Sequence, residues 1–216
     1  MVGVDRPGRR AADLVIGELA AEQTGAAVRL LSERFLDDPV WLAIGPSRRE
    51  HLRAVLNGFH RAELAGAQRY GGVVFTVTVG GALKGVQVAY GAGSYPLPRR
   101  DLLNSVPAML LAGPRPALRA FRVMLALERI HPHHPHVYAR LLAADPSLPG
   151  SGRMLVKRLI EYARAQGAPI YGETMRSENV RFMRSLGFTV TAEPVLLEST
   201  ELWSFRWSEH DHGEHP

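Results

Sequence analysis

Hydrophobic residues recur along the chain with two spacings, one typical of helices and one typical of strands. Apolar side chains three or four residues apart predict amphipathic helices, and short runs rich in β-branched residues predict strands. The segments with helical spacing are 24–35, 47–68, 101–112, 116–130, 152–166 and 177–186. The strand-like segments are 14–19, 73–79, 85–90, 137–144, 170–174, 188–192 and 202–207. We therefore expect a mixed α/β fold.

Residues that end helices or turn strands separate these segments. Thr24 and Ser47 are predicted to cap the first two helices, and Asp37-Asp38-Pro39 to end the first. Gly80-Gly81 lies between two strand-like runs and predicts a hairpin. Residues 131–136 contain four histidines and two prolines and are predicted to form a linker.

The domain organisation follows from where this periodicity begins and ends. Residues 1–10 and 209–216 are polar and charged and are expected to be a flexible N-terminus and a flexible tail, with 11–208 as a single domain. No stretch approaches the ~18 consecutive apolar residues of a membrane span. We expect a cytoplasmic protein that does not bind membranes.

Composition narrows the chemistry. The chain has no cysteine, which excludes disulfides, thiolate metal ligands and a cysteine nucleophile. Its formal net charge is +5, which suits either an anionic partner or a general arginine bias. The basic residues form no long run, so we expect no nucleic-acid partner, while a phosphorylated cofactor stays open.

The segment between the strand at 137–144 and the following helix carries the most specific signal. Its sequence, Asp145-Pro146-Ser147-Leu148-Pro149-Gly150-Ser151-Gly152-Arg153, turns through two glycines into a helix. Glycine lets the backbone approach a ligand, and the free amides of a first helical turn bind phosphate. A plain strand-to-helix connection would also need glycines here. The segment has neither the Walker ending nor the dinucleotide fingerprint.

The order of motifs from residue 137 to residue 188 resembles the cofactor core of the GNAT acetyltransferase superfamily. The resemblance rests on Leu141 to Pro146, Gly150-Ser151-Gly152, Glu173-Thr174, Asn179-Val180-Arg181-Phe182-Met183 and Leu186-Gly187-Phe188. It implies a mixed central sheet with two splayed parallel strands and flanking helices. The helical segments between 101 and 130 would be an insertion before the core strand.

The resemblance also implies a cofactor and a set of residues that contact it. Acetyl-CoA would act as cosubstrate, with its pantetheine arm against the backbone of Leu142 and Ala144 and with Asn179 bonding the pantetheine or pyrophosphate. Gly150, Ser151, Gly152, Arg153 and Met154 would surround the pyrophosphate. For Asn179 a helix cap, and for the strand residues an ordinary core position, are the competing interpretations.

The sequence departs from the family pattern at three positions. Pro149 replaces the usual Gln or Arg and offers no amide. Met154 replaces Gly or Ala and would bring bulk near the pyrophosphate. Met183 replaces a tyrosine that protonates the leaving thiolate in the family, and a thioether cannot donate a proton. A GNAT-fold protein that binds CoA or another ligand without catalysis therefore remains an alternative to an enzyme.

The remaining expectations concern catalysis and partners. Glu173 is the candidate base, with Tyr138 and Tyr171 as other proton-handling groups, and a salt-bridged glutamate or core tyrosines as the structural alternatives. The acceptor would be a small-molecule amine or a peptide, bound by residues 36–70 and 91–135, and a homodimer is possible. The histidines of 131–136 and of the tail lack a regular ligand spacing, so no metal site is expected.

Overall fold

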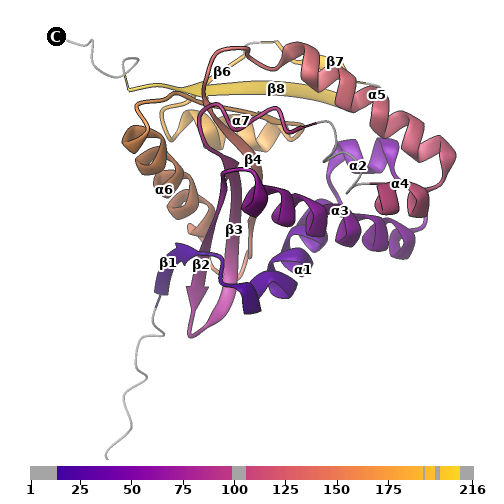
Figure 1. Cartoon of the computed structure of the whole chain (residues 1–216), viewed down its shortest axis with the longest axis horizontal. Coiled ribbons are helices and arrows are strands. Elements are labelled where there is room, and N and C mark those ends of the chain that lie inside the picture. Colours follow the sequence, from indigo (N-terminus) through magenta and orange to yellow (C-terminus); the bar gives the residue numbers. More distant parts are fainter. Residues whose placement is uncertain (1–13, 99–105, 192, 198–199, 210–216) are drawn as a thin grey trace, which may run out of the picture.

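The structure, a computed structural model, describes residues 14–98, 106–191, 193–197 and 200–209. The expected flexible N-terminus, nearly all of the tail and residues 101–105 of an expected helix lie outside these ranges. The described residues form one twisted sheet with helices on both faces (Figure 1). No helix in these ranges has the length and apolar character needed to cross a membrane.

The sheet is antiparallel except at its centre. Its strands are β1 (Leu14–Glu18), β2 (Gly72–Val79), β3 (Ala82–Tyr90), β4 (Val137–Ala144), β5 (Ile170–Thr174), β6 (Thr189–Val190), β7 (Val195–Leu197) and β8 (Thr200–Trp207). They follow the order β1-β2-β3-β4-β5-β8-β6, and β7 pairs with β8. β4 and β5 are parallel neighbours, as expected. Gly80 and Gly81 both have positive φ and make the expected hairpin turn between β2 and β3.

Two helices cover each face of the sheet. α1 (Thr24–Phe35) and α3 (Arg49–Arg69) pack on one face, and α6 (Ser151–Ala165) and α7 (Ser177–Arg184) pack on the other. Apolar positions three and four apart on each helix point to the sheet, so that two core clusters form. The first includes Leu31, Leu64, Val88, Tyr138 and Tyr171, and the second includes Phe75, Leu155, Leu159, Ile170 and Phe205.

A further group of helices lies beside the end of α3. It consists of α2 (Pro39–Ile44), α4 (Val106–Ala112) and α5 (Pro114–Ile130). The last two lie between β3 and β4, where a helical insertion was expected. α5 packs on α2 and α4 and buries Val123 in a cluster with Val40 and Ile44. Its outer face leaves Leu118 and Phe121 about half exposed, at 52% and 46%.

Several local predictions were wrong, mostly at chain turns. Thr24 is the first residue of α1 and not its cap, because a 3-10 turn precedes it. Ser47 does not cap α3, which begins at Arg49. Asp37-Asp38-Pro39 ends one helix but also starts α2, since the Asp38 carboxylate accepts a bond from the Val40 amide. The short strand β7 was not predicted, and β6 is only two residues long.

Candidate functional site

β4 and β5 diverge after a short parallel stretch. They pair only where Val137–Ala139 faces Ile170–Gly172. Beyond this point β4 continues to Ala144 in contact with β3 alone, so its edge toward β5 is open. The register of β4 against β3 shifts between Val88 and Ala89, which makes Arg140 the extra residue of a bulge. The splayed strands expected from the sequence are therefore present.

The loop after β4 leads into α6, whose first turn contains backbone amides without a hydrogen-bond partner in the helix. Gly150 is the N-cap residue and has φ of 89° and ψ of −10°, a left-handed conformation that favours glycine. The amides of Gly152 and Arg153 lie in the first turn and have no intrahelical partner. The Met154 amide is already bonded to the Gly150 carbonyl. The Ser151 hydroxyl is likewise engaged, because it donates to the Leu148 carbonyl at 2.9 Å.

Gly152 leaves a passage between β4 and α7. A Cβ atom added there would lie 3.7 Å from the Ala144 Cβ and 3.8 Å from the Phe182 Cζ, so any larger side chain would narrow this opening. Asn179 lies on the same side and donates to the Thr174 hydroxyl at 2.9 Å. Arg153 is exposed and reaches the Ser185 hydroxyl at 2.8 Å, which ties α6 to α7.

The three positions at which the sequence departs from the family pattern lie in different surroundings. Pro149 is exposed in the loop. The side chain of Met154 packs against the core cluster on the α6 face of the sheet. Met183 is buried in that cluster, with 5% exposure, and also borders the cavity described next.

A single cavity of about 700 Å³ extends from the open edge of β4 to the helices α2, α3 and α5. Near the loop it is lined by Leu142, Ala144, Gly152, Asn179 and Phe182. At its other end it is lined mainly by apolar side chains, including Trp41, Phe59, Val123 and Leu127. Of the residues expected to contact a cofactor, the structure thus places Leu142, Ala144, Gly152 and Asn179 together on one wall.

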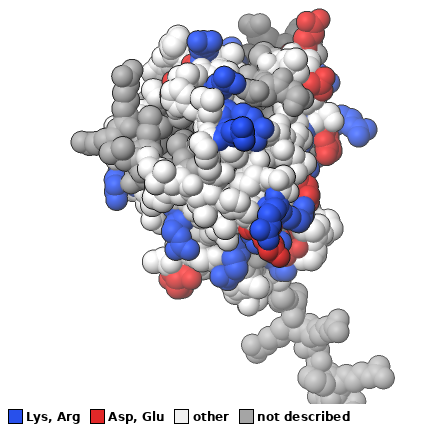
Figure 2. Space-filling model, turned by 90° about the vertical axis from the view of Figure 1, so that its right-hand side faces the viewer, with Lys and Arg blue, Asp and Glu red and all other residues white. Residues whose placement is uncertain are grey.

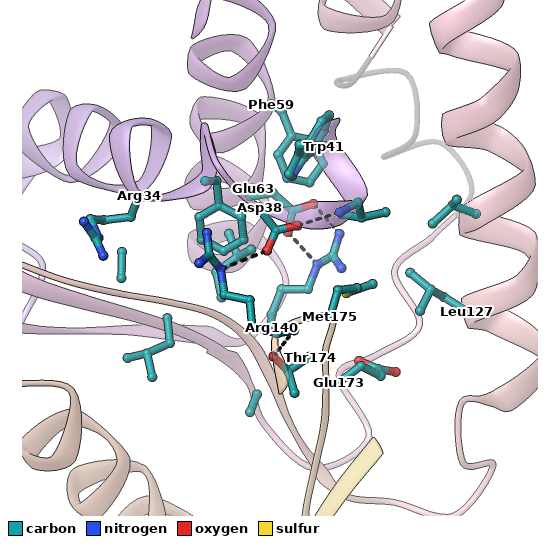
Figure 3. Close-up of a pocket in the computed structure, with 18 of the residues that line it drawn as sticks. Arg34, Asp38, Trp41, Phe59, Glu63, Leu127, Arg140, Glu173, Thr174 and Met175 are labelled. Carbon is teal, nitrogen blue, oxygen red and sulfur yellow. Dashed lines mark hydrogen bonds and ion pairs between the residues drawn. The ribbon is translucent and has the colours of Figure 1, made fainter. Parts of the chain in front are cut away.

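Glu173 lines this cavity and is drawn in Figure 3 below Leu127 and Met175. Its side chain is 6% exposed, and its nearest basic atom is Nδ1 of His131 at 3.8 Å. Oε1 has no hydrogen-bond partner among the described residues. Glu173 lies two residues after Tyr171 on β5. Both side chains therefore point to the same face of the sheet, the face covered by α1 and α3. The arrangement is a buried carboxylate with unused acceptor capacity.

The tyrosines near Glu173 are poor acids. Burial, and then the negative charge of Glu173, raise the pKa of Tyr138 and of Tyr171 well above the usual value. The Tyr171 hydroxyl donates to the Ile130 carbonyl at 3.4 Å and lies 3.2 Å from the Ser204 hydroxyl. Both rings pack edge-on to His131. Phenols held neutral in this way cannot serve as bases near neutral pH.

Two ion pairs complete the polar part of the cavity wall. Arg140 donates from Nε and Nη2 to the two carboxylate oxygens of Glu63, at 2.9 and 3.0 Å. Its guanidinium also lies 5.9 Å from the ring centroids of Phe59 and Tyr138. Arg176 lies 3.6 Å from the Asp38 carboxylate. Burial raises the pKa of Asp38, and the charge of Arg176 opposes this effect.

This polar group could not be predicted from local sequence patterns. Glu63 and Arg140 are 77 residues apart, and nothing in either segment marks the pairing. Residues 131–136 were predicted to be only a linker, yet His131 and His136 are buried, with 9% and 4% exposure. The density of histidines just before a strand was the available signal. Among the described residues no cluster of three or more His, Asp or Glu side chains could hold a metal ion.

The fold is similar to that of several solved acetyltransferases, one of them described as a member of the GNAT family. One of them, from Corynebacterium glutamicum, is described as histone acetyltransferase HPA2 and related acetyltransferase. It matches with a TM-score of 0.68 and 18% identity, over 92% of this chain and 97% of its own. YncA from Salmonella typhimurium, solved with its cofactor acetyl-CoA, matches with a TM-score of 0.55 and 19% identity, over 93% and 96%.

A third solved structure is the polyamine N-acetyltransferase of Drosophila melanogaster, which forms N-acetylagmatine. It matches with a TM-score of 0.55 and 13% identity, over 91% of this chain and all of its own. No protein-family model matches the sequence, and no curated protein matches it either. The similarity therefore defines the fold.

Proposed function

We propose that this protein is an N-acetyltransferase that moves the acetyl group of acetyl-CoA to a primary amine. The observation that carries the proposal is the open edge of β4, which leads into a cavity lined by the buried carboxylate of Glu173, whose Oε1 has no hydrogen-bond partner among the described residues. The pantetheine arm would lie along β4 at Leu142 and Ala144, whose edge toward β5 is unpaired. Proteins of the same fold bind acetyl-CoA or acetylate amines, which supports this choice.

The diphosphate of acetyl-CoA would lie at the start of α6. The free amides of Gly152 and Arg153, the left-handed Gly150 and the helix dipole provide an anion site there. The passage at Gly152 would admit the arm between Ala144 and Phe182. Of the other expected contacts, Ser151 would contribute only through its backbone in the loop, because its hydroxyl already donates to the Leu148 carbonyl. Met154 would contribute only side-chain packing beneath the loop.

Glu173 would act as the base. It would accept a proton from the substrate ammonium, and the free amine would then attack the thioester carbonyl. A C–N bond forms, the C–S bond breaks, and the second amine proton finally resides on the thiol of CoA. Holding both reactants in one cavity supplies much of the rate enhancement. His131 would position the carboxylate, since its Nδ1 lies 3.8 Å from Oε1.

The leaving group can depart without a dedicated acid. Met183 cannot donate a proton. A thiol has a pKa of ~8.5 by analogy with free cysteine, so a thiolate is a tolerable leaving group near neutral pH. The same observation favours the second candidate function, a GNAT-fold protein that binds CoA or another small ligand without catalysis. The two functions differ in turnover and not in cofactor affinity.

The test combines binding with turnover. Calorimetry with acetyl-CoA measures the dissociation constant, and release of free thiol in the presence of primary amines measures transfer. We expect binding that is lost in Gly152→Asp, because the new carboxylate would lie against the diphosphate. Lys157→Asp, an exposed change of charge on the same helix, is the control and should still bind. Binding without any amine-dependent thiol release would favour the non-catalytic alternative, and unchanged affinity in Gly152→Asp would refute the diphosphate site.

A further inference from the structure

The buried carboxylates of the cavity differ in one respect, namely whether an arginine already neutralises them. Glu63 accepts two bonds from Arg140. Asp38 caps α2 through the Val40 amide and lies 3.6 Å from Arg176. Asp38, Glu63 and Arg140 are drawn in Figure 3, with the hydrogen bonds and ion pairs as dashed lines. Neither carboxylate is free to receive a cation without losing an existing partner.

Glu173 is the exception. It is 6% exposed, its only basic neighbour within 4 Å is His131, and Oε1 lacks a hydrogen bond within the described ranges. Two further carboxylates, Glu128 and Glu178, border the cavity at solvent-exposed positions. The buried part of the cavity therefore has one acceptor site for one ammonium group.

The walls around this site are apolar. The Trp41 and Phe59 rings meet edge to face, with their centroids 5.0 Å apart, and border the cavity on the side of α2 and α3. Leu127 of α5 and Met175, which follows β5, contribute further apolar surface, as Figure 3 shows. The inner face of α5 adds Ala117, Ala120 and Val123. Such walls favour a hydrocarbon or aromatic group and offer no partner for charge.

From this distribution of charge we infer that the acceptor is a primary amine with a single ammonium group and an apolar, preferably aromatic, body. The ammonium lies at Glu173, and the body lies between Trp41, Phe59 and the inner face of α5. A second ammonium held against the apolar walls, away from the exposed Glu128 and Glu178, would be buried without a counter-charge or would have to break an arginine pair, and both are unfavourable. The inference deepens the proposed function and rests on it.

The decisive experiment compares amines that differ by one charge. Hexylamine and hexane-1,6-diamine have the same chain, and 2-phenylethylamine adds an aromatic body. With acetyl-CoA saturating, thiol release gives kcat/KM for each. We expect the two monoamines to exceed the diamine by at least about tenfold, the usual size of an apolar specificity contact. Clear turnover with equal or higher kcat/KM for the diamine would overturn this inference and leave the transferase proposal intact. Absence of turnover with every amine, despite acetyl-CoA binding, would refute both.

Two variants test the assigned walls. Leu127→Glu places a second carboxylate opposite Glu173 and should narrow the preference for hexylamine over the diamine by about tenfold, whereas the uncharged Leu127→Gln should not. Trp41→Ala should raise the KM for 2-phenylethylamine and leave acetyl-CoA affinity unchanged. Leu42→Ala, on the exposed side of α2, is its matched control. An unaltered amine preference in Leu127→Glu, in a variant that still binds acetyl-CoA, would refute the placement of the acceptor beside α5.

Discussion

Glu173 combines burial with an incomplete set of partners, a combination that proteins rarely tolerate away from a binding or catalytic site. A carboxylate shielded from water normally accepts several hydrogen bonds, and leaving one oxygen unpartnered is unfavourable. Here Oε1 has no hydrogen-bond partner among the described residues, although Glu173 lines the cavity. Under the proposed function, the amine of the substrate supplies the missing donor.

The first prediction removes this base. Glu173→Gln keeps the size of the side chain but cannot accept a proton from an ammonium group. We expect kcat for amine acetylation to fall by about 10²–10⁴-fold, the usual contribution of a general base, while the dissociation constant of acetyl-CoA is unchanged. Glu161→Gln, an exposed change on α6, is the control. A kcat within twofold of the wild type would assign the proton transfer to another group.

His60 is a second buried titratable residue, with a different role. It is fully buried, its Nδ1 lies 3.0 Å from the Ser32 hydroxyl, and the edges of Phe35 and Phe59 surround it. Burial, followed by the charge of Arg140, lowers the pKa of His60 to about 3. His60 is therefore a neutral part of the core near neutral pH.

A pH dependence of stability follows from His60. In the unfolded chain a histidine binds a proton below pH ~6.5, whereas the folded protein binds one at His60 only near pH 3. Between these values the unfolded state holds the extra proton, so the free energy of unfolding falls as the pH is lowered, by at most ~1.4 kcal/mol per pH unit. We expect the free energy of unfolding, measured with urea at several pH values between 7 and 4.5, to depend less on pH in His60→Leu than in the wild type. The same pH dependence in both proteins would contradict the lowered pKa of His60.

At the scale of elements, the bulge in β4 joins the fold to the site. A regular strand would point alternate side chains to opposite faces, but Tyr138 and Leu141 both lie in the cluster under α1 and α3. The extra residue between them, Arg140, turns toward α3 and meets Glu63. The same irregularity accompanies the loss of pairing with β5. One inserted residue thus both opens the sheet and supplies a buried charge.

The ion pair across this bulge gives the third prediction. Glu63→Gln leaves the Arg140 guanidinium without its counter-charge, and the free energy of unfolding should fall by about 3 kcal/mol, the lower end for a broken buried pair. The double variant Glu63→Leu with Arg140→Met should be closer to the wild type, because neither charge of this pair is left without its partner. Urea unfolding of Glu63→Gln measures the first effect, and urea unfolding of the wild type, Glu63→Leu, Arg140→Met and the double variant completes the cycle. Additive losses would show that the two residues do not interact.

The elements around the proposed cofactor site could be predicted because their signals are local. β5 has the predicted bounds, and Gly150 takes the backbone conformation for which glycine is suited. The acceptor side could not be predicted in the same way. Asp37-Asp38-Pro39 matches both the end of one helix and the start of another, and the pairs at Glu63 and His131 form only when distant segments pack. Local patterns carry no information about such contacts.

On the scale of the whole molecule, the described chain divides into a densely packed part and a loosely held one. The two sheet faces bury most of the core, whereas α5 contacts only α2 and α4 extensively and borders the cavity with its inner face. Its outer side chains Leu118, Phe121 and Leu125 are exposed. A helix with few buried contacts opens locally at low cost.

This arrangement predicts a gradient in amide hydrogen exchange. Without ligand, the amides of α5 should exchange faster than those of α6, which is anchored by Leu155, Val156 and Leu159 in the core. An acceptor amine bound between α5 and Trp41 should slow exchange in α5 specifically, because it fills the space beneath the helix. Exchange measured by mass spectrometry, with 2-phenylethylamine and without it, provides the comparison. Equal protection of α5 and α6 in the free protein would refute this view of the fold.

The continuity of the cavity has a consequence for inhibition. The β4 edge and the apolar walls at Trp41 border one continuous cavity of about 700 Å³, which Glu173 also lines. A single molecule that joins an apolar amine to the sulfur of CoA through a two-carbon bridge would occupy both ends at once. Its second end would bind at a high effective concentration, so we expect it to compete with acetyl-CoA at least about 10²-fold more tightly than CoA itself does. The conjugate made from 2-phenylethylamine should surpass the one made from hexane-1,6-diamine, and the same ranking in inhibition and in turnover would place both molecules in the same space.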